Sequence, residues 1–152
     1  MNSKSVILHV EDDPNDVLLV GLAFRKAGLG VNLQVVNDGE QAVQYLAGEG
    51  GYADRHAFPV PALVLLDVKL PRRSGLEVLG WVRGREELRR LPIVMLTSSN
   101  QAADVNRAYD LMANSYLVKP SALEELVEVI KKITGYWLEL NVKPVIGEDD
   151  NL

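Results

Sequence analysis

The sequence contains no cysteine. It therefore has no disulfide framework, no thiolate nucleophile and no cysteine–zinc site, and it suits a reducing compartment such as the cytoplasm. Long apolar runs are missing too, because the longest, residues 58–66, contains two prolines and is far shorter than the roughly 20 residues that cross a bilayer. Residues 1–5 lack the apolar segment of a secretory signal. We expect a cytoplasmic protein with no membrane partner.

Basic residues are fewer than acidic residues. The chain has 16 lysine and arginine residues against 21 aspartate and glutamate residues, so its net charge is −5. This sign disfavours binding to a phosphate backbone, and we expect no nucleic-acid partner. The basic cluster consists of Arg83, Arg85, Arg89 and Arg90, interrupted by Glu86 and Glu87. Mixed charge without aromatic residues is typical of a solvated connector, which we expect there.

The chain is long enough for one globular domain with a single core, because it has 152 residues and 47% of them are hydrophobic. Five short apolar runs alternate with segments of helical pattern. The expected strands are Val6–Val10, Leu33–Val36, Leu63–Leu66, Ile93–Leu96 and Tyr116–Val118. Several runs are continuously apolar, as strands buried on both faces are, and strands that alternate with helices form parallel sheets. We predict an α/β fold with helices on both faces of the sheet.

Capping residues mark the helix starts. Asp13 can accept hydrogen bonds from free helix amides and Pro14 suits the first helical position, so a helix is expected to about Ala27. Further starts are predicted by Ser74 with Glu77, Ser121 with Glu124 and, more loosely, Asp38 with Gln41. Apolar stripes consist of Val105, Ala108, Tyr109 and Met112 in one segment and Leu123, Leu126, Val127 and Ile130 in another. We expect both stripes to pack on the sheet and residues 48–60 to form a long surface loop.

Polar groups follow four of the five expected strands. They are Glu11, Asp12 and Asp13 after the first strand, Asp67 after the third, Thr97 after the fourth and Lys119 after the fifth. The carboxyl ends of parallel strands meet at one edge of a sheet, which is where ligands bind in such folds. We therefore expect these groups to converge, with Asp13 serving as the helix cap rather than as a site acid.

Acids that gather at one edge favour a bound cation. Two carboxylates about 4 Å apart repel by roughly 4 kcal/mol at an effective dielectric constant of about 20, so they shift their pKa values or bind a cation. Mg²⁺ suits a site with few carboxylates because it retains several waters, whereas Ca²⁺ requires more protein oxygens. His9 and His56 have no partner at zinc-ligand spacing, and we expect both to be structural or solvent-facing.

A carboxylate beside Mg²⁺ and an ammonium group can accept a phosphoryl group. Asp67 would be the nucleophile, the metal and Lys119 would neutralise the phosphoryl oxygens, and Thr97 would donate to one of them. New charge on Asp67 would draw Thr97 inward and shift the surface between two states.

At these residues the chain resembles the receiver domain of two-component response regulators, the CheY-like proteins. The matching segments are Val6–Asp12, Leu65–Pro71, Leu96–Ser98 and Tyr116–Pro120. A match to any one segment is weak evidence, but four matches in the same order, each at the end of an expected strand, are a highly specific signal. The resemblance covers residues 4–138 and implies a flavodoxin-like, doubly wound sheet with the strand order 2-1-3-4-5.

The resemblance also implies a role for each site residue. Asp67 would be the phosphoacceptor, and Thr97 and Lys119 would hold the phosphoryl group. Tyr116 would be the aromatic switch that turns inward as Thr97 moves. The implied Mg²⁺ ligands are Asp12 and Asp67 directly, Glu11 through water, and the backbone carbonyl of Lys69. The family usually has a cis peptide bond at the position of Lys119–Pro120.

Segment 48–60 and the ending Tyr136–Leu138 resemble stand-alone regulators paired with bacterial phytochromes and similar sensor kinases. The implied protein is a single-domain signalling protein, not an enzyme, that receives its phosphoryl group from a sensor histidine kinase, here of bacteriophytochrome type. We expect the receiver domain at residues 1–138 and a tail at residues 139–152. The tail's apolar residues, Leu140, Val142, Val145 and Ile146, are expected to cover a second subunit in a homodimer.

Two other functions compete with this interpretation. A degenerate receiver would act as a phosphorylation-independent interaction module, but the intact set of Asp12, Asp67, Thr97 and Lys119 disfavours it. An aspartyl phosphatase of the dehalogenase type would place its nucleophile after the first strand and an acid two residues later. Asp67 follows the third strand, and Lys69 stands where that acid would be.

Overall fold

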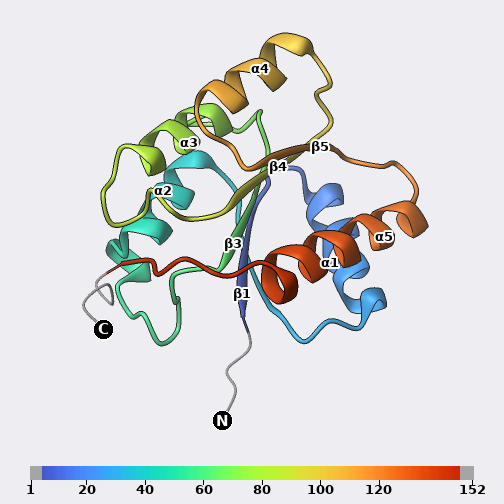
Figure 1. The fold of residues 1–152 in the computed structure, drawn as a ribbon, viewed down its shortest axis with the longest axis horizontal. Coiled ribbons are helices and arrows are strands. Elements are labelled where there is room, and N and C mark those ends of the chain that lie inside the picture. Colours follow the sequence, from blue (N-terminus) through green and yellow to red (C-terminus); the bar gives the residue numbers. More distant parts are fainter. Residues whose placement is uncertain (1–4, 148–152) are drawn as a thin grey trace.

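The structure, a computed structural model, describes residues 5–147 and is built around a five-stranded parallel sheet (Figure 1). The strands are β1 (Val6–Val10), β2 (Asn32–Val36), β3 (Leu63–Leu66), β4 (Ile93–Thr97) and β5 (Ser115–Val118). Their order is β2-β1-β3-β4-β5, with every neighbouring pair parallel. This confirms the predicted flavodoxin-like order, and β1, β3 and β4 are buried along their whole length, as continuously apolar strands require.

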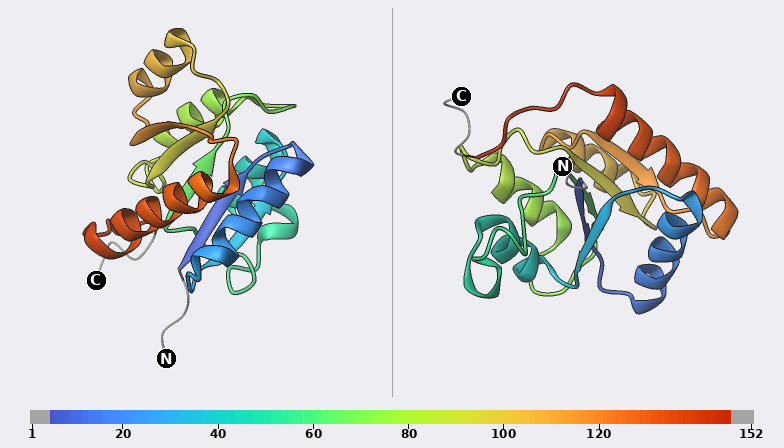
Figure 2. Two further views of the ribbon diagram at one scale, coloured as in Figure 1. Left: turned by 90° about the vertical axis from the view of Figure 1, so that its right-hand side faces the viewer. Right: turned by 90° about the horizontal axis from the view of Figure 1, so that it is seen from below.

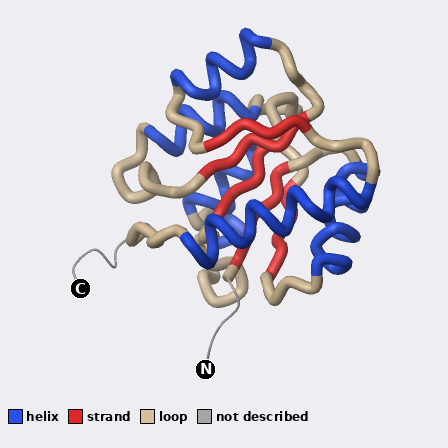
Figure 3. The backbone as a smooth tube through the Cα atoms, turned by 45° about the vertical axis from the view of Figure 1, so that its right-hand side comes forward, coloured by secondary structure: helices blue, strands red, loops and turns tan. Residues whose placement is uncertain are grey.

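Helices cover both faces of the sheet. They are α1 (Pro14–Ala27), α2 (Gly39–Ala47), α3 (Gly75–Arg83), α4 (Ala102–Asp110) and α5 (Leu123–Thr134), with a short 3₁₀ turn η1 (Gly50–Tyr52) and a π-helical turn η2 (Gly135–Leu140). Figure 2 shows α1 and α5 on one side of the sheet and α2 and α3 on the other, and Figure 3 shows the strands as the layer between them. Alternate residues of a strand enter the two cores: Leu8 packs with α2 and α3, and Ile7 with α1 and α5.

Most of the predicted helix starts are confirmed. The Asp13 side chain accepts from the Asn15 amide at 2.9 Å with Pro14 at the first helical position, and α1 ends before Gly28, which has φ of 68°. Ser74 and Glu77 form a full capping box at the start of α3. At α2 the Asp38 side chain accepts from the Gln41 amide at 2.7 Å.

Three expectations about local structure are wrong. Ser121 and Glu124 form no capping box, because α5 begins one residue later than that box requires, with Ala122 at the N-cap. The stripe around α4 does not pack as a unit, because the helix ends at Asp110 and Met112 lies beyond it at φ of 70°, with 67% of its surface exposed. The described chain contains no cis peptide bond, so Lys119–Pro120 is trans, the ordinary isomer.

Residues 48–60 are more ordered than a surface loop. The rings of Tyr45, Tyr52 and Phe58 pack against one another with centroids 5.1–5.9 Å apart. Arg55 donates to the carbonyls of Tyr45, Leu46 and Phe58, and so satisfies the last carbonyls of α2. Aromatic burial, which a count of glycine and polar residues does not register, folds this segment onto the core.

The chain after α5 turns back along its own subunit. Residues 141–147 run past the amino-terminal ends of β1 and β3 (Figure 1). One groove there is lined by residues that include Val6, Ala62, Pro144 and Ile146. Ile146 packs against the core of its own chain, while Leu140, Val142 and Val145 are exposed. Among residues 5–147, every helix is too short or too polar to cross a bilayer.

The basic cluster is not a uniformly solvated connector, because Arg83 is half-buried and joins three segments. Its guanidinium donates to the carbonyls of Met112, Arg89 and Leu91 at 2.9, 2.9 and 2.7 Å. It also donates to Asn114 Oδ1 at 3.0 Å, and that oxygen accepts from the Ile93 amide as well. Arg83 therefore fixes the end of α3 to the segments that precede β4 and β5.

Replacing Arg83 with methionine should lower the free energy of unfolding by about 2 kcal/mol, because three carbonyls lose a charged donor. Urea denaturation followed by circular dichroism measures the difference. Arg89→Met is the matched control, since that side chain is exposed, and it should change stability by less than about 0.5 kcal/mol. Equal losses in the two variants would show that Arg83 is not a structural clamp.

Candidate functional site

The predicted groups do converge at the carboxyl edge of the sheet. Glu11 and Asp12 directly follow β1, Asp67 follows β3, Thr97 ends β4 and Lys119 follows β5. The sheet ladder continues into the site, because the amides of Glu11, Asp67 and Lys119 donate to carbonyls of neighbouring strands at 3.0, 3.2 and 2.8 Å. Main-chain hydrogen bonds therefore fix the backbone positions from which these acidic and basic side chains extend.

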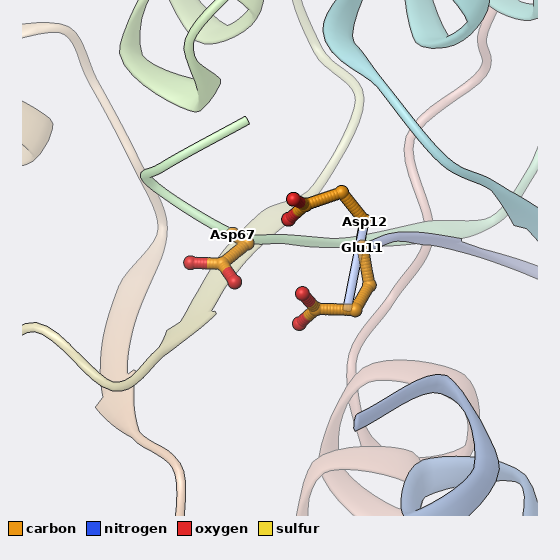
Figure 4. A group of neighbouring side chains, drawn as sticks. All are labelled: Glu11, Asp12 and Asp67. Atoms are coloured by element: carbon orange, nitrogen blue, oxygen red, sulfur yellow. The ribbon is translucent and has the colours of Figure 1, made fainter. Parts of the chain in front are cut away.

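The acid cluster consists of Glu11, Asp12 and Asp67, which offer carboxylate oxygens within 4.8 Å of one another. Figure 4 shows the three side chains, from two neighbouring strands, gathered into one small space. Glu11 and Asp67 are buried, with 1% and 6% of their surfaces exposed, while Asp12 is exposed at the entrance. An all-oxygen donor set with one open side fits a hard divalent cation such as Mg²⁺.

Lys119 connects this cluster to α1. Its ammonium lies 2.6 Å from Glu11 Oε1, 2.7 Å from Asp16 Oδ2 and 3.2 Å from Asp67 Oδ2. Burial would lower the pKa of Lys119, but the hydrogen bonds to Asp16 and Glu11 and the charge of Asp67 outweigh it, so the net pKa is raised. The ammonium therefore stays charged at neutral pH.

The two buried acids titrate differently. Burial raises the pKa of Glu11 to about 7, and the nearby charge of Asp67 adds to that effect, although the hydrogen bond to Lys119 opposes it. Burial also acts to raise the pKa of Asp67, but hydrogen bonding with Thr97 and the charge of Lys119 outweigh it and leave the pKa lowered. Asp67 is therefore the ionised carboxylate, which is the form a nucleophile needs.

Gly75 is a site residue that the sequence analysis missed. A Cβ atom at this position would lie 1.7 Å from the backbone oxygen of Asp67, so any side chain would displace the acid. The Gly75 amide donates to the Val68 carbonyl at 2.7 Å and ties the start of α3 to the loop after β3. The only sequence signal was its place directly after the capping residue Ser74.

Thr97 and Tyr116 meet at the loop that follows β4. Thr97 is buried, and its Oγ1 accepts from the Ser99 amide at 3.3 Å. Tyr116 is partly buried and donates its hydroxyl to the Ser99 carbonyl at 2.8 Å, while Ser99 Oγ donates to Asp104 Oδ2 at 2.6 Å. The loop between β4 and α4 is therefore held by polar contacts that Tyr116 and Asp104 provide.

Two further residues from the sequence analysis, Lys69 and Asp13, lie next to the acid cluster in the sequence. Lys69 follows Asp67 by two residues with its side chain exposed, and Asp13 caps α1 as expected. Asp16, which lies in the first turn of α1, also contacts Lys119. The sequence held no signal for that contact, because the two residues are 103 positions apart.

Comparisons with known proteins agree on one family. The model of the response regulator receiver domain matches residues 7–131. The probable methanogenesis regulatory protein FilR2 of Methanothrix harundinacea is 39% identical over 140 residues, which cover 91% of this chain and 87% of FilR2. The response regulator Rcp1 of Synechocystis is 36% identical over 143 residues, which cover 94% of this chain and 95% of Rcp1.

Solved structures give the same result. The phosphorylated cyanobacterial phytochrome response regulator RcpA has a TM-score of 0.86 at 34% identity, covering 93% of this chain and 99% of RcpA. The Mn²⁺-bound form of Rcp1 has a TM-score of 0.81 at 36% identity, covering 92% of this chain and 99% of Rcp1.

His9 lies in β1 beneath the site and is buried, and neither ring nitrogen has a hydrogen-bond partner among the described residues. Burial lowers the pKa of His9 to about 4, and the charge of Lys119 acts in the same direction. The folded protein therefore holds a neutral imidazole in conditions where the unfolded chain takes up a proton. Stability is lost as pH falls from the unfolded pKa, about 6.5, toward the folded one.

Replacing His9 with leucine should remove this loss. As the pH is lowered from about 8 to about 5, the free energy of unfolding of the variant should rise by about 2 kcal/mol relative to that of the natural sequence. Urea denaturation at the two pH values measures this change. His56→Leu, which removes an exposed loop histidine, is the matched control. An equal change in that control would rule out buried His9 as the source.

Proposed function

The chain belongs to the response regulator receiver family, and on that premise we propose that it is a regulator that accepts a phosphoryl group on Asp67 from a sensor histidine kinase. The observation that carries the proposal is the state of Asp67, a buried carboxylate held ionised between the acid cluster and the ammonium of Lys119. Asp67 Oδ attacks phosphorus as the bond to the donor nitrogen breaks, and the imidazole of the donor histidine leaves with the electron pair.

The protein's part in this transfer is electrostatic. Lys119 carries the positive charge that faces the phosphoryl oxygens, and the hydroxyl of Thr97 donates to one of them. The residues that would hold Mg²⁺ are Asp12 and Asp67 directly, Glu11 through water, and Lys69 through its backbone carbonyl. Bound Mg²⁺ supplies further neutralisation of the phosphoryl charge. The Mn²⁺-bound form of Rcp1 supports a divalent cation here.

The signal leaves the site through the loop after β4. Phosphorylation draws Thr97 toward Asp67, which changes the contacts of Ser99 and releases Tyr116 to turn inward. We assign the receiver to residues 1–138 and propose that the output passes to proteins, in the cytoplasm, and not to nucleic acid. Similarity to Rcp1 and to the phytochrome response regulator RcpA supports a kinase of bacteriophytochrome type as the phosphoryl donor.

A second copy of the chain is part of the proposal. Leu140, Val142 and Val145 lie in the segment after α5 with 78%, 92% and 49% of their surfaces exposed. Apolar surface concentrated in this way is typical of an interaction site. We propose that these three residues cover a partner subunit in a homodimer, whereas Ile146 packs within its own chain.

Incubation with Mg²⁺ and acetyl phosphate should add about 80 Da, the mass of one phosphoryl group, to the protein. Asp67→Asn should abolish the addition, because the amide is not a nucleophile, and Asp110→Asn, an exposed acid on α4, should not. Intact-protein mass spectrometry measures the adduct. Lack of an adduct in the natural sequence would favour the phosphorylation-independent module, and rapid turnover of phosphate esters would favour the phosphatase.

Replacing Leu140, Val142 and Val145 together with serine should weaken dimerisation by about 100-fold, because three apolar side chains lose their burial. Sedimentation equilibrium measures the dissociation constant. Leu18→Ser, which alters an exposed leucine on α1, is the control and should leave dimerisation unchanged. A monomeric natural protein, or a dimer of undiminished strength in the triple variant, would refute this part of the proposal.

A further inference from the structure

Lys119 has three carboxylate partners, but they are not equivalent. A lysine ammonium has three N–H donors, and the partners Glu11, Asp16 and Asp67 account for all three. Glu11 and Asp67 also belong to the acid cluster, so a bound cation competes with Lys119 for them. Asp16 is the one partner among the described residues that lies outside that cluster.

Asp16 is also attached to a rigid element. It lies in the first turn of α1, whose start is capped by Asp13. The buried side chains of α1, including Val20 and Phe24, pack in one core with Leu126 and Ile130 of α5. Since α5 follows the loop that carries Lys119, this packing fixes the distance between the helix bearing Asp16 and the strand end bearing Lys119.

The lengths of the contacts indicate how the ammonium is placed. The contact to Asp16 is 2.7 Å and that to Asp67 is 3.2 Å, so Lys119 lies closer to Asp16 than to the acceptor carboxylate. A short charge-assisted hydrogen bond is stronger and more directional than a long one. The acceptor is therefore held near a positive charge without being tightly bound by it.

We propose that Asp16 is a positioning residue for Lys119, which holds the ammonium beside Asp67 while cation binding and phosphorylation change the other two carboxylates. The inference rests on the proposed phosphoacceptor role of Asp67. Asp16 acts through Lys119 and does not bind the cation or the phosphoryl group. Its removal should slow the phosphorylation of Asp67 without altering the affinity for Mg²⁺, because Lys119 then samples positions away from the acceptor.

The first experiment tests the contact in protein free of metal and phosphate. In ¹⁵N-labelled protein, the Lys119 ammonium should give a slowly exchanging signal, since its side chain is 8% exposed and its donors are bonded. Asp16→Ala should cause this signal to be lost by solvent exchange, and Asp16→Glu should retain it. A signal unchanged in Asp16→Ala would overturn the inference, whether or not Asp67 is phosphorylated.

The second experiment measures function in the same proteins. With acetyl phosphate and Mg²⁺, Asp16→Ala should phosphorylate Asp67 about tenfold more slowly, with an unchanged half-saturating Mg²⁺ concentration. Asp16→Glu should restore at least half of the rate. Glu40→Ala, which removes a partly buried acid from the first turn of α2, outside the site, is the control for loss of one helix-terminal charge.

Two functional outcomes would overturn the inference. An unchanged rate in Asp16→Ala would show that Lys119 needs no anchor, and a loss of Mg²⁺ affinity and folding stability equal to the loss of rate would show a merely structural role. If the natural protein is not phosphorylated at all, the proposed function fails. The ammonium signal then still decides whether Asp16 holds Lys119.

Discussion

The site depends on one buried ammonium. Glu11 and Asp67 are withdrawn from water at the end of a parallel sheet, and carboxylates in that environment are costly unless a positive charge balances them. Lys119 supplies that charge from the end of β5, a strand that is three positions away from β1 in the sheet. Because its net pKa is raised, the ammonium of Lys119 stays charged at neutral pH. A second positive charge, from a divalent cation, would complete the charge balance.

The fold makes this arrangement possible by fixing the strand ends. Strands β1, β3 and β4 are buried on both faces by two separate apolar cores, so their carboxyl ends cannot shift without exposing apolar surface to water. Gly75 adds a local constraint, because the backbone of α3 approaches the Asp67 carbonyl too closely for any side chain. Hydrophobic burial thus positions charged groups that would repel one another if they were free to move.

The features that could be predicted from the sequence are those that neighbouring residues determine. Apolar runs identified the strands, Asp13 and Ser74 marked helix starts, and the residues after each strand identified Asp67 and Lys119 as members of one site. The resemblance to receiver domains added the strand order, which the structure confirms. The strands and the helix starts, unlike the strand order, are encoded within a few residues of where they occur.

Two of the features that were missed or wrong depend on contacts between distant residues. Arg83 was grouped with its charged neighbours, although it binds carbonyls in two segments, one before β4 and one before β5. The Asp16 contact also joins residues far apart in the chain, so no spacing rule could find it. The stripe of α4 failed for a different reason: a period of 3.6 residues shows which side chains share a face, but not where the helix ends.

The weak apolar packing of α4 bears on how the proposed switch would operate. Only Ala108 of this helix is fully buried, so apolar burial contributes little to holding it in place. The preceding loop is held instead by hydrogen bonds from Tyr116 and Ser99, each worth about 1 kcal/mol. A new charge on Asp67 changes the energy of nearby polar groups by at least as much. The segment held by polar contacts is therefore the one that the proposed phosphorylation would move, while the strands that carry Asp67 and Lys119 would stay in place.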